Sequence, residues 1–274
     1  AVADGKVYVG SEDWRVYCLD ASTGALVWSY PTEGSVYYSS PAVVDGRVYV
    51  GSDDHKVYCL DASTGGFLWK YTTGGGVWSS PAVIDGRVYV GSNDYQVYCL
   101  NASDGAYIWS YPTGSNVVSS PAIACGKVYV GSYDNRVYCL AASTGECLWG
   151  YATGDAVGSS PAVAYDRVYV GSWDNKIYCL SAVTGEHIWN YTTGNHIWSS
   201  PAVFDGKVYI GSVDSNVYCL DAATGAYIWD HTIGYVMSSP AVADGKIYVG
   251  SSLGEVYCLA ASDGAYIWSY LTGG

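Results

Sequence analysis

Apolar residues in this chain form short runs separated by turn sequences, and a set of four such runs repeats from end to end. In the repeat that begins at Ser79, the runs cover residues 80–84, 88–91, 97–100 and 107–111. Asp85-Gly86 separates the first two runs and is a strong signal for a tight hairpin turn. Each repeat is therefore predicted to be an antiparallel sheet of four strands, which we name A to D in chain order.

Strands B and C are apolar at nearly every position. In the same repeat they read Val-Tyr-Val-Gly (88–91) and Val-Tyr-Cys-Leu (97–100). A sheet with one face in water would alternate between apolar and polar residues, whereas a sheet covered on both faces would not. The pattern therefore predicts sheets that are packed between two neighbours.

The repeats follow one another at a nearly constant distance. The marker Ser-Ser-Pro-Ala places its proline at Pro41, Pro81, Pro121, Pro161, Pro201 and Pro240, and a seventh copy without Ser-Ser-Pro opens the chain at Ala1. A period near 40 residues with strand-rich units is typical of a β-propeller. We expect an all-β fold, a single seven-bladed propeller over residues 1–274, with a shortened A strand in the first blade. The units cover about 1–38, 39–78, 79–118, 119–158, 159–198, 199–237 and 238–274.

Each unit carries one tryptophan on its D strand and one cysteine on its C strand. The tryptophans are Trp28, Trp69, Trp109, Trp149, Trp189, Trp229 and Trp268. Burying an indole is worth a gross ~4–6 kcal/mol, so we expect these residues to dock neighbouring blades. The cysteines are Cys18, Cys59, Cys99, Cys139, Cys179, Cys219 and Cys258. Equivalent points on neighbouring blades lie too far apart for disulfides, so these cysteines are predicted to be small buried residues.

The turn between strands C and D contains a recognisable motif. Residues 18–28 read Cys-Leu-Asp-Ala-Ser-Thr-Gly and continue to Trp28, and the pattern returns at Cys59 to Trp69. This motif resembles Ala-x-Asp-x-x-Thr-Gly-x-x-x-Trp of the pyrroloquinoline-quinone-type propeller repeat, which occurs in bacterial quinoprotein dehydrogenases and outer-membrane assembly lipoproteins. The resemblance covers the whole chain and implies the propeller fold. Because the repeat serves enzymes and scaffolds alike, it does not decide between them.

Three departures from the dehydrogenase pattern bear on catalysis. Those enzymes usually have eight blades, hold quinone and calcium with residues in irregular insertions, and often stack the quinone on a disulfide between adjacent cysteines. This chain has seven units, no insertion and no Cys-Cys pair. The family's catalytic residues therefore have no counterparts here, and we predict no catalytic residue, no cofactor and no metal site.

The copies differ most in the B–C and D–A connections, which we expect on one face of the propeller. The candidate ligand-binding residues there are Trp14, Tyr38, His55, Trp78, Tyr95, Tyr133, Trp173, His196 and Trp198. Two interpretations stay open: unconstrained drift with packing around the channel, or a surface that binds a protein, peptide or carbohydrate. The A–B turns are nearly uniform and indicate turn chemistry. The aspartates at the B–C tips are also predicted to stabilise hairpins.

Charge and composition limit the partners. The net charge of −13 and a pI near 4.4 argue against binding to nucleic acid or anionic membranes. No apolar run is long enough to span a membrane. The sequence specifies no oligomeric state. The resemblance favours an extracellular or cell-surface location, while free cysteines leave the cytoplasm open.

The preferred function is a non-enzymatic binding or scaffold module, interpreted as the sensor or adhesive part of a larger secreted protein. One alternative is a quinone-dependent oxidoreductase domain. The other is a purely structural ring of recently amplified or engineered repeats. No histidine shares a repeated register with a nucleophile, which argues against hydrolytic chemistry.

Overall fold

Seven four-stranded antiparallel sheets make up the structure, a computed structural model that describes residues 1–272. In every sheet the strands follow one another in chain order. These sheets are the blades of an all-β propeller, as the repeat predicted. Within the described range, no helix is long and apolar enough to cross a lipid bilayer.

The strands have the following bounds. Blades one to three contain β1 (Val2–Ala3), β2 (Lys6–Ser11), β3 (Arg15–Asp20), β4 (Leu26–Pro31), β5 (Ala42–Val44), β6 (Arg47–Ser52), β7 (Lys56–Asp61), β8 (Phe67–Thr72), β9 (Ala82–Ile84), β10 (Arg87–Gly91), β11 (Gln96–Asn101) and β12 (Tyr107–Pro112). Blades four and five contain β13 (Ala122–Ala124), β14 (Lys127–Ser132), β15 (Arg136–Ala141), β16 (Cys147–Ala152), β17 (Ala162–Ala164), β18 (Arg167–Gly171), β19 (Lys176–Ser181) and β20 (His187–Thr192). Blades six and seven contain β21 (Ala202–Phe204), β22 (Lys207–Gly211), β23 (Asn216–Asp221), β24 (Tyr227–Thr232), β25 (Ala241–Ala243), β26 (Lys246–Ser251), β27 (Glu255–Ala260) and β28 (Tyr266–Leu271). The first A strand is shortened to two residues, which confirms the expectation for blade one.

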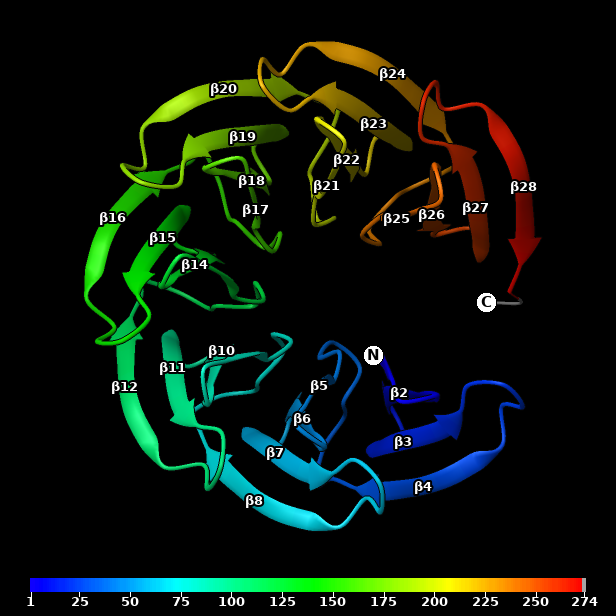
Figure 1. Cartoon of the computed structure of the whole chain (residues 1–274). Coiled ribbons are helices and arrows are strands. Elements are labelled where there is room, and N and C mark those ends of the chain that lie inside the picture. The colour runs from blue at the N-terminus through cyan, green and yellow to red at the C-terminus, as the bar shows by residue number, and fades with distance from the viewer. Residues whose placement is uncertain (273–274) are drawn as a thin grey trace. The chain divides into compact units, whose positions relative to one another are not determined.

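The chain divides into two compact units. The first contains Ala1–Ser132 and Leu140–Cys147, and the second contains Tyr133–Cys139 and the residues from Leu148 onward. Within the first unit, the D strands β4, β8 and β12 lie on the outer side and the A strand β5 lies on the inner side (Figure 1). The connections between strands therefore project from the two remaining sides of each blade.

A row of three side chains crosses each blade. In the third blade, Tyr89 on β10 is paired with Cys99 on β11, which is paired with Trp109 on β12. Directly paired residues point to the same face of a sheet, so the small thiol lies between two large rings. The ring centroids of Tyr89 and Trp109 are 5.8 Å apart. This spacing explains why every copy has a small residue at the cysteine position.

The cysteines behave as the sequence predicted. None of the nine forms a disulfide, and the seven on C strands are fully buried. Burial raises the pKa of the Cys59 thiol to about 11, so it stays protonated at neutral pH. Cys125 is exposed and Cys147 is half-buried.

Two neighbouring blades are joined by hydrogen bonds to a single main-chain carbonyl oxygen. Ala142 O accepts hydrogen bonds from Trp109 Nε1 at 3.1 Å, Tyr89 Oη at 3.1 Å and Arg87 Nη1 at 2.8 Å. Gly145 follows in the same turn with a φ of +76°, and a Cβ there would lie 2.6 Å from the Trp109 ring. The tryptophan therefore packs flat against a turn that only glycine can form so closely.

The same joint recurs with Ala62, Ala102 and Ala222 as acceptors. Five of the seven tryptophans are 5–8% exposed: Trp28, Trp69, Trp109, Trp189 and Trp229. Trp149 is half-buried and donates to Ala182 O at 3.4 Å. Trp268 on β28 is 41% exposed. The joint thus combines a buried indole with its hydrogen bond at Trp28, Trp69, Trp109 and Trp189.

The two serines of Ser-Ser-Pro have structural partners. Ser39 Oγ accepts a hydrogen bond from Gly51 N on its own blade at 2.9 Å. Ser40 N donates to Ser80 Oγ on the next blade, also at 2.9 Å. In the second unit, Ser160 N donates to Ser200 Oγ in the same way. These hydroxyls therefore hold the inner strands together and are not placed as nucleophiles.

Candidate functional site

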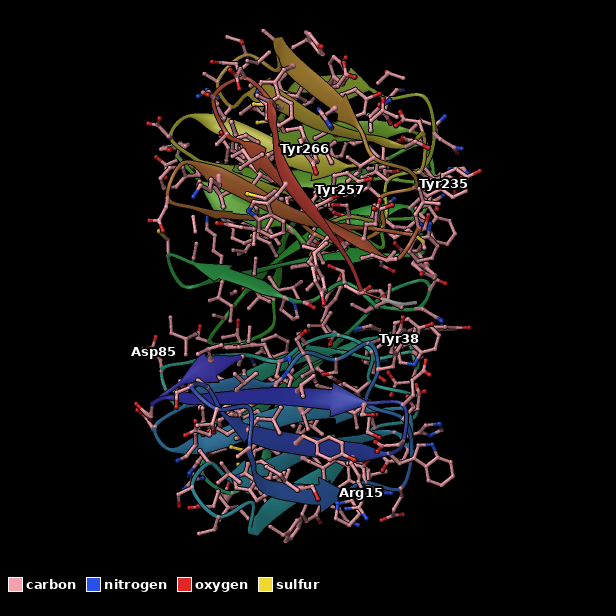
Figure 2. The ribbon with its side chains drawn as sticks, turned by 90° about the vertical axis from the view of Figure 1, so that its right-hand side faces the viewer. Arg15, Tyr38, Asp85, Tyr235, Tyr257 and Tyr266 are labelled. Carbon is pink, nitrogen blue, oxygen red and sulfur yellow. The ribbon has the colours of Figure 1, made fainter. Side chains whose placement is uncertain are left out.

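The B–C and D–A connections lie on one side of the first unit and the A–B turns on the other. Figure 2 shows Arg15, beside the first B–C tip, and Tyr38, from the first D–A segment, on one side, with Asp85 of an A–B turn on the opposite side. The two kinds of connection meet because strands alternate in direction. We name this side of each unit the variable face.

The B–C tips share an unusual backbone conformation. The third residue of the tip has a positive φ in every blade: 68° at Trp14, 68° at His55, 71° at Tyr95, 67° at Asn135, 69° at Asn175, 82° at Ser215 and 75° at Gly254. Asparagine and glycine adopt this conformation readily, whereas an aromatic ring there is strained. Trp14 and Tyr95 are nevertheless 56% and 48% exposed. The strain is therefore not balanced by burial of the ring.

The aspartate that recurs at six of the seven tips hydrogen-bonds to nearby groups of the chain. Asp94 Oδ2 accepts hydrogen bonds from Gly74 N at 2.6 Å and Tyr98 Oη at 2.7 Å, and Asp94 Oδ1 accepts one from Gln96 N at 3.1 Å. Gly74 belongs to the D–A segment of the preceding blade. Burial and the bond to Asp94 raise the pKa of Tyr98. These carboxylates stabilise hairpins, as the sequence indicated, and they also tie the D–A segment of one blade to the B–C tip of the next.

An aromatic cluster forms on the variable face of the first unit. Tyr38 stacks on Trp78 with ring centroids 4.6 Å apart and planes 26° apart. Tyr37 contacts Tyr38 edge-on at 4.8 Å. Trp78 Nε1 donates a hydrogen bond to Asp53 Oδ1 in a B–C tip. Because Tyr37 and Tyr38 are 61% and 56% exposed, the cluster presents two tyrosines to solvent above a fixed indole.

A second cluster forms in the second unit around Trp173. Tyr133 lies 4.9 Å and Trp198 lies 4.4 Å from the Trp173 ring, measured between centroids. A His196 ring nitrogen contacts Trp173 O. Three connections from neighbouring blades therefore supply one patch of rings, and Trp198 is 39% exposed.

The second cluster keeps an unused hydrogen-bond donor. Trp173 Nε1 is buried and has no acceptor among the described residues. A Cβ on Gly158 would lie 3.2 Å from Tyr133 Cε1 and 3.6 Å from Trp173 Nε1, so this glycine lets the backbone approach the rings. An unpaired buried donor is costly unless a ligand or a small movement supplies an acceptor.

The sequence candidates therefore fall into two groups. The structure brings together Tyr38 with Trp78, and Tyr133 with Trp173, His196 and Trp198. Trp14, His55 and Tyr95 join no ring cluster within residues 1–272. Tyr37 and Asp53 are contact residues that were not among the candidates, although each stands beside one in the sequence.

Ion pairs are few on this face. Glu33 accepts from Lys56 Nζ and Lys70 Nζ, both at 3.0 Å. Hydrogen bonds from both lysines lower the pKa of Glu33. The Glu33 and Lys70 side chains are exposed, and ion pairs at such exposed sites contribute little to stability.

The residues present do not fit a quinone held with calcium. Among residues 1–272, no three His, Cys, Asp or Glu side chains are grouped so that they could hold a metal ion. The tip aspartates are already bonded to backbone N–H groups and tyrosines. No two cysteines are adjacent in the sequence to form a platform for the quinone ring.

Comparisons with known proteins agree on the repeat. The family model described as outer membrane protein assembly factor BamB matches residues 1–74, 37–132 and 57–270. BamB from Moraxella catarrhalis has a similar structure with a TM-score of 0.85 and 21% identity, covering 100% of this chain and 87% of that one. No curated protein sequence matches the chain significantly.

Two further solved structures have the same fold. The computationally designed protein Ika8 has a TM-score of 0.87 at 18% identity, covering 98% of this chain and 85% of its own. A europium-containing methanol dehydrogenase has a TM-score of 0.85 at 14% identity, covering 100% of this chain and 77% of its own. At these identities the likeness establishes the fold and not the activity.

Proposed function

Because the chain belongs to the outer membrane protein assembly factor BamB family of propeller repeats, we propose that it is a non-enzymatic module that binds a polypeptide partner on its variable face. The family's description as an assembly factor supports a protein partner over a small substrate. The absence of a donor set for quinone and calcium within residues 1–272 is consistent with this choice.

The observation that carries the proposal is the cluster of Tyr133, Trp173 and Trp198. Its rings come from three connections in neighbouring blades and stay partly exposed. Exposed tryptophan and tyrosine beside polar backbone are the residues that dominate protein interfaces. A peptide backbone would also supply the carbonyl acceptor that Trp173 Nε1 lacks.

The test is binding of the protein to arrays of peptides and glycans, followed by affinity measurements on the hits. Trp198→Ala is expected to weaken binding of a peptide hit more than tenfold, since anchoring aromatics typically contribute about 2 kcal/mol or more. The control is Tyr227→Ala, which removes a ring that is 52% exposed from the outer strand β24 of the same unit. The control should bind as the unmodified protein does.

Other results would contradict the proposal in distinguishable ways. Glycan hits alone would make the partner a carbohydrate. Binding by Trp198→Ala and by a second variant, Trp78→Ala, that equals binding by the unmodified protein would favour a purely structural ring. Saturable quenching of tryptophan fluorescence by pyrroloquinoline quinone with calcium, together with dye-linked alcohol oxidation, would establish the oxidoreductase alternative.

A further inference from the structure

A cleft of about 680 Å³ opens on the side of the first unit opposite Tyr38. The A–B turns of blades two and three form its walls with Asp45, Arg47, Asp85 and Arg87, and the C–D turn of blade three closes it with Asn101. Its volume lies in the range of sites for small molecules. Because the A–B turns are nearly uniform in sequence, the repeat pattern predicts no binding site on this side.

Both arginines are anchored by one end of the guanidinium. Arg47 Nη1 donates to Ala102 O at 2.9 Å and to Ser103 O at 2.7 Å. Arg87 Nη1 donates to Ala142 O at 2.8 Å. A guanidinium has five N–H donors, so each side chain is held in place while most of its donors remain unused.

Neither charge is neutralised inside the chain. Arg47 and Arg87 are half-buried, and within residues 1–272 neither forms an ion pair, although Asp45 and Asp85 line the same cleft. Partial removal of a cation from water penalises its charge, and an anionic partner offsets that penalty. Two unpaired guanidiniums in a chain of net charge −13 therefore need an explanation.

Comparison with another copy of the repeat shows that the cleft lacks a carboxylate in the facing C–D turn. In the second unit, Arg167 Nη1 donates to Ala222 O at 2.8 Å in the same manner. In the C–D turn that faces Arg167, Asp221 occupies the position that Asn101 occupies in the turn facing Arg47. Hydrogen bonds from Thr224 lower the pKa of Asp221, and Arg167 contributes to the same shift. Opposite Arg87 the position is Ala141, so both arginines of the cleft face a turn without a carboxylate.

We propose that this cleft binds a small oxyanion, a carboxylate or phosphate, through the free donors of Arg47 and Arg87 and the amide of Asn101. Guanidinium forks match both groups in a bidentate geometry. Asp45 and Asp85 line the cleft with carboxylates that can accept hydrogen bonds, so the ligand also carries donors beside its anionic group. Amino acids and sugar phosphates share this chemistry.

The test is calorimetric titration of the full chain at low salt with three probes: inorganic phosphate, glucose 6-phosphate and L-alanine. Saturable binding is expected for one of the two organic probes, which identifies the source of the anion, with weaker binding of inorganic phosphate. The affinity should fall as salt is added. No saturable binding of any probe would overturn the proposal.

Variants separate a binding role from a structural one. Asn101→Asp restores the carboxylate found in other copies, and Asp61 shows that the turn accepts it, since Asp61 Oδ1 bonds Ser63 N at 3.0 Å. This variant should keep its unfolding midpoint and bind at least tenfold more weakly. Arg47→Lys should also weaken binding at least tenfold because the fork is lost. The matched control is Arg167→Lys, which should bind normally. Unchanged binding by Asn101→Asp, or equal loss in the control, would contradict the assignment.

Discussion

The indole Nε1 of Trp109 donates a 3.1 Å hydrogen bond to the main-chain carbonyl oxygen of Ala142, one blade further along the chain. Because the ring is 6% exposed, replacing Trp109 with alanine leaves a cavity in the joint and is expected to cost about 3–5 kcal/mol of unfolding free energy. Tyr107→Ala on the same strand, where the ring is 55% exposed, is the control and should cost less than about 1 kcal/mol. Denaturant titrations followed by fluorescence and circular dichroism measure both. Equal, small losses would show that the joint is not held by its indole.

Replacement of the glycine that faces the Trp109 ring should lower the unfolding free energy. Gly145 and Gly126 have similar backbone conformations, with φ of +76° and +71°, but a Cβ on Gly145 would lie 2.6 Å from the Trp109 ring and one on Gly126 meets nothing within 4 Å. Gly126→Ala therefore reports backbone strain alone, about 1 kcal/mol. Gly145→Ala adds overpacking of about 1–3 kcal/mol. Matching midpoints for the two variants in denaturant would refute the contact.

A third prediction concerns the small residue between two rings. Cys99 is fully buried between Tyr89 and Trp109, whose centroids are 5.8 Å apart. Cys99→Leu would force these rings apart and is expected to destabilise the fold by about 1–3 kcal/mol, whereas Cys99→Ala should cost less than about 1.5 kcal/mol. Thermal unfolding of the two variants side by side gives the comparison. A leucine variant as stable as the alanine variant would mean that the space between Tyr89 and Trp109 holds a larger side chain without strain.

The blades could be predicted from sequence because their signals are local. Asp85-Gly86 fixes a hairpin, and the structure gives both residues a positive φ, 50° and 69°, as a two-residue turn of this type requires. Gly105 lies four residues before Trp109 on the same blade, and this spacing recurs in every copy. Local turn chemistry and a constant period were therefore sufficient for the fold class.

The contacts of the candidate sites were beyond sequence reasoning because they join different blades. Trp173 meets Tyr133, which lies 40 residues earlier in the chain, and that contact depends on the offset between two sheets. The strain at Trp14 is a backbone property that no residue pattern displays. The Arg47 cleft was missed for another reason: its significance lies in Asn101, a residue of a different turn.

Acid should weaken the C–D turns that contain aspartate. Hydrogen bonds from Ser63 and Thr64 lower the pKa of Asp61 from 3.8 to about 2. Because the folded pKa lies below the unfolded one, this aspartate contributes stability above about pH 4 that is lost as the pH falls toward 2. Asp61→Asn should flatten the dependence of the denaturant midpoint on pH in that window, as the natural Asn101 turn suggests. Identical pH profiles for the variant and the unmodified protein would count against the role of this carboxylate.

A single substitution in the A–B turn of the fifth blade should stabilise the protein. Tyr165 and Asp166 have φ values of 54° and 55°, and this is the A–B turn in which glycine is missing from the second position. A residue with a side chain in the left-handed region costs about 1–2 kcal/mol, so Asp166→Gly is expected to raise the unfolding free energy by about that amount. Tyr165 should keep its place, since its Oη accepts a hydrogen bond from Gly206 N at 3.2 Å. The reverse change, Gly46→Asp, is the control: a Cβ there meets nothing within 4 Å, so it tests backbone strain alone and should destabilise the protein by a similar amount. If Asp166→Gly lowers the melting temperature, the aspartate is stabilised by interactions that outweigh its strained backbone.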